Sequence, residues 1–289
     1  MSTTATAIAP APQRGWRKRF RDNPTSWMGV VVIALVVLAA IFAPWLTPYD
    51  PLEQNIADRL IAPSAEHLLG TDTYGRDVLS RLLHAARISL AIGAAAIALA
   101  LVIGSAIGIL AGYIGGWFDA VITSLLDVLL SFPTLLLGLM VVAMLGPSIE
   151  NLVAAIALTE LAPFARVARA PTIALKGRDF IEAGRALGFS DLRLVVVHII
   201  PNLLSEVVVV ASLWMATAIR TEASLSFIGL GVKPPTPTWG GMIREGFENI
   251  LDAPWLAVAP GFAILVTVLG LNLVGDGLRD AIDPKVRRD

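Results

Sequence analysis

The sequence predicts an all-α integral membrane protein with six transmembrane helices. Hydrophobic residues make up 56% of the 289 positions and charged residues only 16%, and the mean hydropathy is +0.73. Such values are typical of membrane proteins. Several apolar runs approach the roughly 20 residues that a helix needs to cross about 30 Å of hydrocarbon. None of them alternates apolar and polar residues as barrel strands do.

Six apolar runs are the candidate spans. The first follows a basic segment, but it is long and lacks a small-x-small cleavage pattern, which favours an uncleaved span over a signal peptide. The fourth is the weakest, because it is short and contains Glu160 and the helix breaker Pro163. In chain order the runs are Trp27–Leu46, Ile88–Ile114, Val121–Leu145, Ile149–Phe164, Ile199–Ile219 and Leu256–Val274.

The distribution of basic residues predicts the orientation. Cytoplasmic segments of membrane proteins are enriched in Lys and Arg. Both termini and the fourth loop are expected in the cytoplasm, because together they hold Arg14, Arg17, Lys18, Arg19, Arg21, Arg166, Arg169, Lys176, Arg178, Arg185, Arg193, Arg279, Lys285, Arg287 and Arg288. The predicted boundaries are a tail at 1–26, the first span with an outer loop at 27–87, a core at 88–275 with a cytoplasmic loop at about 167–198, and a tail at 276–289.

Two outer segments carry local patterns. Residues Gly75–Arg87 place apolar side chains at helical spacing, which predicts an amphipathic helix lying at the membrane interface. In the segment Arg220–Trp255, the prolines and glycines between 229 and 241 forbid a continuous helix. This second segment is either a docking or gating surface or a plug for the outer end of the bundle, and the sequence favours neither.

The second span carries small residues on one helical face. Gly104, Gly108 and Gly112 are spaced by four residues. Within lipid, such a face lets two helix backbones approach closely. The spacing predicts helix packing, either inside the chain or across a subunit interface.

A polar segment between the fourth and fifth spans predicts a short helix over Asp179–Leu187. Asp179 is a suitable N-cap, Glu182 suits the reciprocal capping position, and Gly188 suits the left-handed residue that ends a helix. Ser190 is then expected to cap a helix that runs through Pro201 into the fifth span.

This short helix is predicted to be amphipathic. At 1.5 Å per residue it is about 13 Å long, too short to cross a membrane. Phe180, the Ala183-Gly184 pair and Leu187 share one face. A projecting amphipathic helix suits a contact that transmits force to a partner protein. The alternative is an ordinary connecting loop that happens to be helical.

Three carboxylates are pathway candidates. Asp127, Glu160 and Glu206 fall within or near apolar runs. An intramembrane carboxylate costs roughly 2.5–3.5 kcal/mol on insertion scales, so each is expected to face protein or water. They either line a pathway that attracts ammonium groups or cations, or form structural pairs.

Enzymatic and metal sites are not indicated. The chain contains no cysteine, and its three histidines are scattered, so no metal site and no cofactor are predicted. Neither a Gly-x-Ser-x-Gly nor a His-Glu-x-x-His motif occurs. The formal net charge of −1 gives no basic surface for nucleic acid. A Gly-x-x-x-x-Gly-Lys-Ser/Thr phosphate loop is also missing, so any transport energy must come from another subunit or from an ion gradient.

Four separated stretches resemble a known family. They are His67–Arg81, then Glu182–Gly184 with Gly188 and His198–Asn202, then Glu222–Gly231 with Trp239-Gly240, and finally Asn272–Pro284. In this order they resemble the second permease subunit of the dipeptide, oligopeptide and nickel ABC importers. Gly184 and His198 depart from the common pattern, and Gly184 loosens a helix by up to about 1 kcal/mol relative to Ala.

The resemblance implies a type I ABC importer transmembrane domain in the cell inner membrane. It implies a heterodimer with a second, homologous permease subunit, two cytoplasmic ATP-binding subunits, and a periplasmic or lipid-anchored substrate-binding protein. It also implies that the short helix couples to the ATPase through Asp179, Phe180, Glu182, Ala183, Gly184, Leu187, Gly188 and Pro201. The expected cargo is a di- or oligopeptide, glutathione-like compound or nickel chelate. The alternatives are an ion-coupled transporter or channel that acts alone, and a scaffold subunit.

Overall fold

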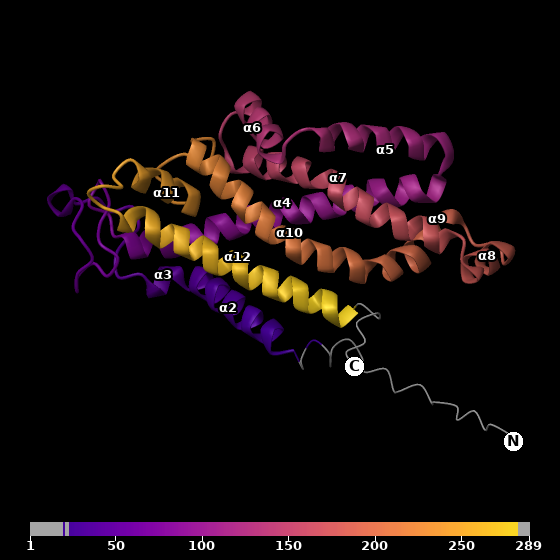
Figure 1. The fold of residues 1–289 in the computed structure, drawn as a ribbon, viewed down its shortest axis with the longest axis horizontal. Helices are drawn as coiled ribbons and strands as arrows, with labels where there is room; N and C mark the ends of the chain where they lie inside the picture. The colour runs from indigo at the N-terminus through magenta and orange to yellow at the C-terminus, as the bar shows by residue number, and fades with distance from the viewer. Residues whose placement is uncertain (1–19, 21–22, 283–289) are drawn as a thin grey trace, which may run out of the picture.

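Long apolar helices run side by side along the longest axis of the molecule (Figure 1). The computed structural model describes residue 20 and residues 23–282. Within this part of the chain, five helices are long and apolar enough to cross a membrane, or up to six if one bent pair counts as a span. The five are α2 (Pro24–Ile41), α4 (Val78–Ile114), α7 (Ile149–Lys176), α10 (Ile200–Ile228) and α12 (Trp255–Ile282). The prediction of an all-helical membrane fold is confirmed.

The predicted third span is not one straight helix. It consists of α5 (Gly116–Ser131) and α6 (Thr134–Leu145), which meet at an angle of 91°. The break falls at Phe132 and Pro133. Proline has no backbone N–H and disfavours the helical conformation of the residue before it. Phe132 accordingly has extended dihedral angles, with ψ at 135°. Counting hydrophobic residues over Val121–Leu145 could not reveal this bend.

The predicted interfacial helix over Gly75–Arg87 is wrong. These residues form the first turns of α4, a single helix of 37 residues, after Asp77 caps its start by accepting a hydrogen bond from the Ser80 amide at 2.8 Å. Val78, Arg81 and Ala85 are buried rather than facing a membrane surface. These turns are therefore a direct extension of the helix that contains the second span.

The fourth span is longer than the sequence indicated. Instead of ending near Phe164, α7 continues through Pro163 and Pro171 to Lys176. Each proline removes one helical hydrogen bond, yet the helix is held on one side by close packing against α4. An added Cβ at Gly108 would lie 2.0 Å from the Ala165 carbonyl oxygen, which shows how near the two backbones are.

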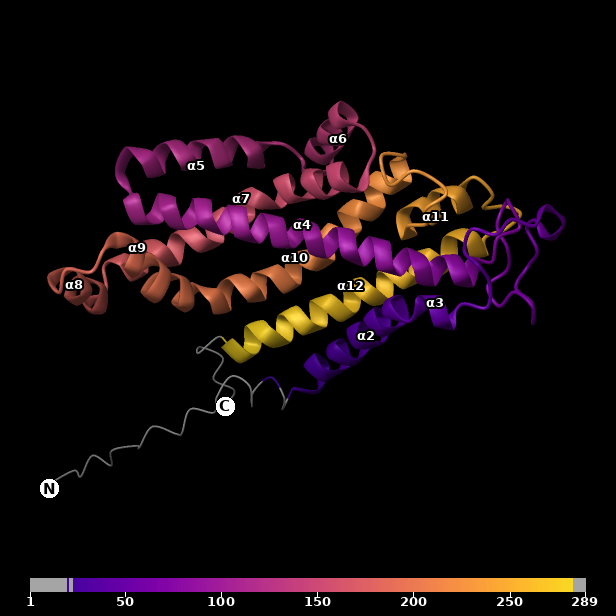
Figure 2. The ribbon, with the colours of Figure 1, turned by 180° about the vertical axis from the view of Figure 1, so that it is seen from behind.

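The first and last spans pack against each other. Gly29 of α2 faces Leu273 of α12, and Gly277 of α12 faces Ser26 at the start of α2. The described ends of the chain therefore lie together at one end of the bundle, as both views show (Figures 1 and 2). Most of the basic residues predicted in the two tails lie outside the described residues.

The two ends of the bundle carry different small helices. At one end, called here the α8 end, α8 (Asp179–Ala186) and α9 (Asp191–Arg193) connect α7 to α10 through a π-helical segment, η2 (Leu194–Ile199). At the other, the α11 end, α3 (Ala43–Leu46), η1 (Ile56–Asp58) and α11 (Trp239–Phe247) gather with their loops (Figure 2). As predicted, residues 229–238 between α10 and α11 are not helical.

Candidate coupling site and pathway

The polar segment after α7 forms a short helix that ends as the sequence predicts. α8 covers Asp179–Ala186, and Gly188 follows it with a φ of +80°. Glycine occupies this left-handed region without strain. The predicted N-cap is wrong: Arg178 is the N-cap residue, its side chain makes no capping bond, and Asp179 is the first helical residue. The carboxylates of Asp179 and Glu182 instead lie in the first turn, where the helix dipole favours negative charge.

The buried side of α8 differs from the predicted apolar face. Ile181 is fully buried, and Gly184 packs so closely that an added Cβ would lie 2.8 Å from the Leu194 side chain. Phe180 and Leu187, by contrast, are 44% and 76% exposed. Ala183 is exposed as well. The sequence grouped Gly184 with these residues, but in the structure it belongs to the inward side with Ile181.

The connection from α8 to α10 is continuous and ordered by side chains. Ser190 accepts a hydrogen bond from the Arg193 amide at 3.4 Å, as its predicted capping role requires. The rings of Phe189 and His198 are stacked, with centroids 6.0 Å apart. Pro201 lies in the first turn of α10, directly after the π-helical segment η2. The wide turn η2 is a π-helical element of the kind often found at functional sites.

Tyr113, at the end of α4, contacts three segments of this loop. Its hydroxyl donates to Asp191 at 2.5 Å and lies 3.5 Å from a guanidinium nitrogen of Arg185. The Arg185 guanidinium and the Lys176 ammonium lie 5.8 and 5.6 Å from the ring centroid. The hydrogen bond to Tyr113 raises the pKa of Arg185 above its ordinary value, so this residue stays charged. No local sequence pattern singles out Tyr113.

The three pathway candidates lie in different surroundings. Asp127 of α5 pairs with Arg166 of α7, and both side chains are exposed. Glu160 is buried on α7 and makes no hydrogen bond among the described residues. Glu206 is exposed on α10. The structure does not bring the three carboxylates together.

A polar stripe runs along α10, and the sequence analysis missed most of it. Glu206, Thr217 and Arg220 recur at helical spacing, and Arg220 donates to the Thr217 hydroxyl at 3.1 Å. Arg220 was placed in an outer loop because α10 was predicted to end at Ile219. Arg220 lies fourteen residues after Glu206, which is about four helical turns. This spacing could have indicated that the two charged residues share one face of a helix. Members of the stripe are Asn202, Glu206, Thr217, Arg220 and Ser224.

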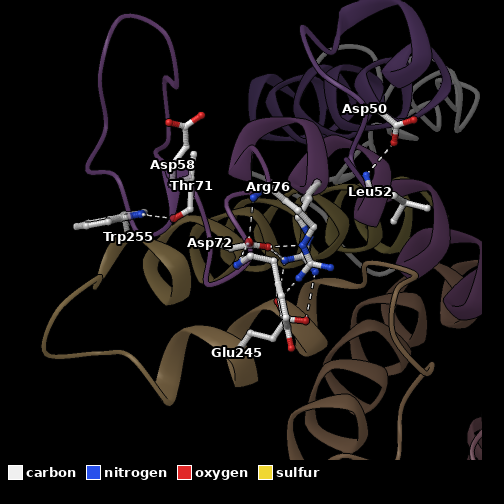
Figure 3. A network of polar contacts seen from close by, with 10 residues as sticks. Asp50, Leu52, Asp58, Thr71, Asp72, Arg76, Glu245 and Trp255 are labelled. Carbon is white, nitrogen blue, oxygen red and sulfur yellow. Dashed lines mark hydrogen bonds and ion pairs between the residues drawn. The ribbon is translucent and has the colours of Figure 1, made fainter. Parts of the chain in front are cut away.

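The α11 end is tied together by a buried ionic network (Figure 3). Asp72 accepts from Arg76 at 2.7 Å and also pairs with Arg81, and all three side chains are only 3% exposed. Glu245 of α11 accepts from Arg81 at 2.7 Å and from Arg76 at 3.3 Å. The network links the segment before α4 to α11 by charge-assisted hydrogen bonds. The sequence included Asp72, Arg76 and Arg81 in a family-like stretch without assigning them a role.

Trp239 anchors the second outer segment instead of presenting it to solvent. It is 2% exposed, its amide donates to Ser89, and its indole N–H donates to the Leu82 carbonyl, each at 3.2 Å. Glu222 lies fully buried nearby and accepts from Ser226 at 2.8 Å. Of the two roles considered for this segment, these contacts of Trp239 fit a plug that closes the end of the bundle better than an exposed docking surface.

Comparison with known proteins decides the family. A model described as "Binding-protein-dependent transport system inner membrane component" matches residues 104–288. A second model, described as "N-terminal TM domain of oligopeptide transport permease C", matches residues 12–63. The chain belongs to the binding-protein-dependent transport system inner membrane component family. It is therefore a multi-pass inner-membrane permease subunit of an ABC importer, as the four sequence stretches indicated.

Similar proteins support this membership along nearly the whole chain. The dipeptide transport system permease protein DppC of Alkalihalophilus pseudofirmus is 42% identical over 98% of this chain and 92% of its own length. The glutathione transport system permease protein GsiD of Escherichia coli O157:H7 is 44% identical over 94% of this chain and 90% of its own length.

A solved structure supports the fold. A chain of the MetNI methionine ABC transporter in an inward-facing conformation superposes with a TM-score of 0.56, at 17% identity, over 70% of this chain and 96% of that chain. This similarity shows that the helices of the present chain are arranged as in a known importer membrane subunit.

Proposed function

We propose that this chain moves di- or oligopeptides, or a related small solute such as glutathione, across the inner membrane, driven by ATP hydrolysis on partner subunits. The cargo is inferred from the dipeptide and glutathione permeases that resemble the chain at 42% and 44% identity. The nucleotide site is assigned to the partners because the full sequence lacks a phosphate loop. A second homologous permease subunit, two ATP-binding subunits and a periplasmic or lipid-anchored binding protein complete the proposed importer.

The observation that carries the proposal is the exposed side of α8. A short helix at one end of the bundle buries Ile181 and presents Phe180, Leu187 and the polar Glu182 outward. Exposed apolar side chains at a helical tip, beside ionisable ones, suit a protein docking surface. The α8 end is accordingly assigned to the cytoplasm, where the ATP-binding subunits are. The coupling residues inferred from the resemblance lie on this helix or just after it, except Pro201, which lies in the first turn of α10.

Force is transmitted through the α8–α10 connection. ATP binding draws the two ATP-binding subunits together, and each moves the helix docked on it. Because Gly184 packs against Leu194 and Ile181 is fully buried, a displacement of α8 is passed into η2 and then into α10. A rigid-body movement of this kind exchanges inward-facing and outward-facing states of the pathway.

The pathway is proposed to run along the polar stripe of α10. An exposed charge such as Arg220 or Glu206 within a span is costly in lipid, so this face must meet water or a partner subunit. Glu160, buried on α7, is a further carboxylate that needs protein or water around it within the spans. Carboxylates and guanidinium groups together suit zwitterionic cargo such as peptides. The exposed Asp127–Arg166 pair must likewise be covered by water or by the second permease.

Replacing Glu182 and Gly188 together tests the coupling assignment. In the complex with its ATP-binding subunits, Glu182→Ala/Gly188→Val should still hydrolyse ATP while uptake of labelled dialanine or glutathione falls strongly. Valine is strained at the φ of +80° that Gly188 adopts. The control is Gly177→Ala, which lies nearby without a positive φ and with open space around it. Normal uptake per ATP in the double variant would contradict the proposal.

A further inference from the structure

Tyr113 holds the loop that carries α8 to the end of α4. The loop has another attachment, which is apolar: Gly184 packs against Leu194, and Ile181 is fully buried in the main hydrophobic core. Among the described residues, the polar and cation–π contacts between α8 and α4 all pass through Tyr113 and Arg185. In this part of the chain, Tyr113 therefore provides the polar and cation–π contacts between α8 and α4, and the remaining contacts between them are apolar.

The position of Tyr113 on α4 is rigid. Its ring belongs to the main hydrophobic core and is 8% exposed. The preceding residue, Gly112, packs so closely on α7 that an added Cβ would lie 2.9 Å from the Arg169 carbonyl oxygen. Tyr113 thus cannot move without moving the joint α4–α7 unit, whereas its hydroxyl is directed at the loop.

The contacts of Tyr113 span the whole loop from its start to its end. Lys176 is the last residue of α7, Arg185 lies in α8, and Asp191 is the first residue of α9. Lys176 and Arg185 make cation–π contacts with the Tyr113 ring. The Tyr113 hydroxyl donates a hydrogen bond to Asp191 and accepts one from Arg185. A charged partner makes such hydrogen bonds about twice as strong as neutral ones. The geometry therefore joins three segments at one point.

We propose that Tyr113 is a positioning residue that makes the α4–α7 unit follow α8 when the ATP-binding subunits move it. The proposal rests on the function proposed above, since it requires α8 to be the coupling helix. Without the Tyr113 hydroxyl, α8 would still bind its partner and still push η2 and α10. Its attachment to the α4–α7 unit would then rest on the chain between α7 and α8 and on apolar packing, so part of each ATP-driven displacement would fail to reach α4 and open the pathway.

Tyr113→Phe is the central test, because it keeps the buried ring and removes only the hydroxyl. In proteoliposomes that contain the complete importer, labelled dialanine or glutathione transported per ATP hydrolysed should fall about three- to tenfold, the change expected for losing one side-chain hydrogen bond. Binding of the ATP-binding subunits and the thermal stability of the complex should not change. An unchanged transport-to-hydrolysis ratio would overturn the proposal.

Partner substitutions distinguish a positioning role from a general structural one. Asp191→Asn keeps an acceptor oxygen for the hydroxyl but loses the charge, so its ratio should lie between those of the wild type and of Asp191→Ala. Asp191→Ala should lower the ratio as Tyr113→Phe does, and the double variant should be no worse than either single one. Additive losses would contradict a shared contact. Tyr74→Phe is the matched control, since no hydrogen bond from the Tyr74 hydroxyl exists within the described residues.

The same assay separates this inference from the proposed function. If Glu182→Ala/Gly188→Val uncouples hydrolysis from uptake but Tyr113→Phe does not, α8 is the coupling helix and the role of Tyr113 is wrong. If neither variant changes the ratio, the assignment of α8 as the coupling helix fails first. Uncoupling by both variants, with Tyr74→Phe unchanged, supports both.

Discussion

Gly108 lies where the backbones of α4 and α7 come closest. A Cβ at this position would sit 2.0 Å from the Ala165 carbonyl oxygen, a rigid backbone atom rather than a flexible side chain. We expect Gly108→Ala to destabilise the folded chain by about 1–3 kcal/mol or more, because overpacking forces neighbouring atoms apart. Thermal unfolding of the purified protein in detergent measures this loss.

Gly261 provides the matched control for that substitution. It lies in α12 with open space around its Cβ position. Gly261→Ala should be neutral or should stabilise the helix by up to about 1 kcal/mol, because alanine has the higher helix propensity. Equal effects of the two alanines would show that the α4–α7 contact is looser than described.

The buried network at the α11 end supplies a second prediction at this scale. Asp72→Asn removes the charge that Arg76 and Arg81 share, and all three side chains are 3% exposed. Breaking a buried ion pair in this way typically costs about 3–5 kcal/mol. Glu248→Gln, in the exposed pair with Arg244, should cost about 0–1 kcal/mol. Chemical denaturation that gives similar losses for both variants would refute the buried role of Asp72.

Single residues were predictable where a local rule determines them. Gly188 was identified because a short helix must end at a residue that tolerates positive φ, and Ser190 because a hydroxyl commonly caps the next helix. Tyr113 and Glu245 were not identified, because their partners are far away in the sequence: Asp191 lies 78 positions from Tyr113, and Arg81 lies 164 positions from Glu245. No periodicity records such pairs.

At the scale of the element, the two sides of α8 should respond differently to substitution. Phe180→Ser/Leu187→Ser changes only exposed side chains, so the chain should fold normally but bind its ATP-binding subunits more weakly. Ile181→Ala empties a fully buried position and should cost about 2–5 kcal/mol of stability. Co-purification and thermal unfolding, measured on the same samples, separate the two effects.

The reverse pattern would contradict the docking assignment. If the Phe180 and Leu187 variant lost stability while keeping its partners, the exposed side of α8 would face this chain's own neighbours in the membrane. Ala186→Ser is a suitable control, since Ala186 is exposed on the same helix and contributes little apolar area.

Prolines explain why some elements were predicted wrongly. Pro133 breaks the third span, whereas Pro163 and Pro171 lie inside a continuous α7. All three are helix breakers by intrinsic propensity. The difference is tertiary: α7 is held along its length by the glycine face of α4, while the segment around Pro133 is largely exposed. Local rules therefore indicate where a helix is weak, and packing decides whether it bends.

At the scale of the whole molecule, hydropathy alone predicted the fold class and the approximate positions of the spans. Apolar length is a property of each run by itself, so α2, α4, α10 and α12 were all found. The arrangement of the spans depends on pairs such as Gly277 with Ser26, which belong to opposite ends of the chain. Only the resemblance to a known family anticipated this arrangement before the structure.

Orientation in the membrane is the last prediction. The basic residues of the loop around α8 should keep the α8 end in the cytoplasm. The chain has no native cysteine, so a single introduced cysteine reports its own position. Ala186 at the α8 end and Ala65 at the α11 end are both exposed. A membrane-impermeant maleimide should label Ala65→Cys in right-side-out vesicles and Ala186→Cys in inside-out vesicles.

The two variants control for each other, because in each type of vesicle the maleimide should label one introduced cysteine and leave the other unlabelled. Both replace an exposed alanine with cysteine, so differences in reactivity that come from burial are small. Labelling of Ala186→Cys from outside would place α8 where no ATP-binding subunit could reach it. Coupling through α8 and the transmission assigned to Tyr113 would then both be impossible, whatever the identity of the cargo.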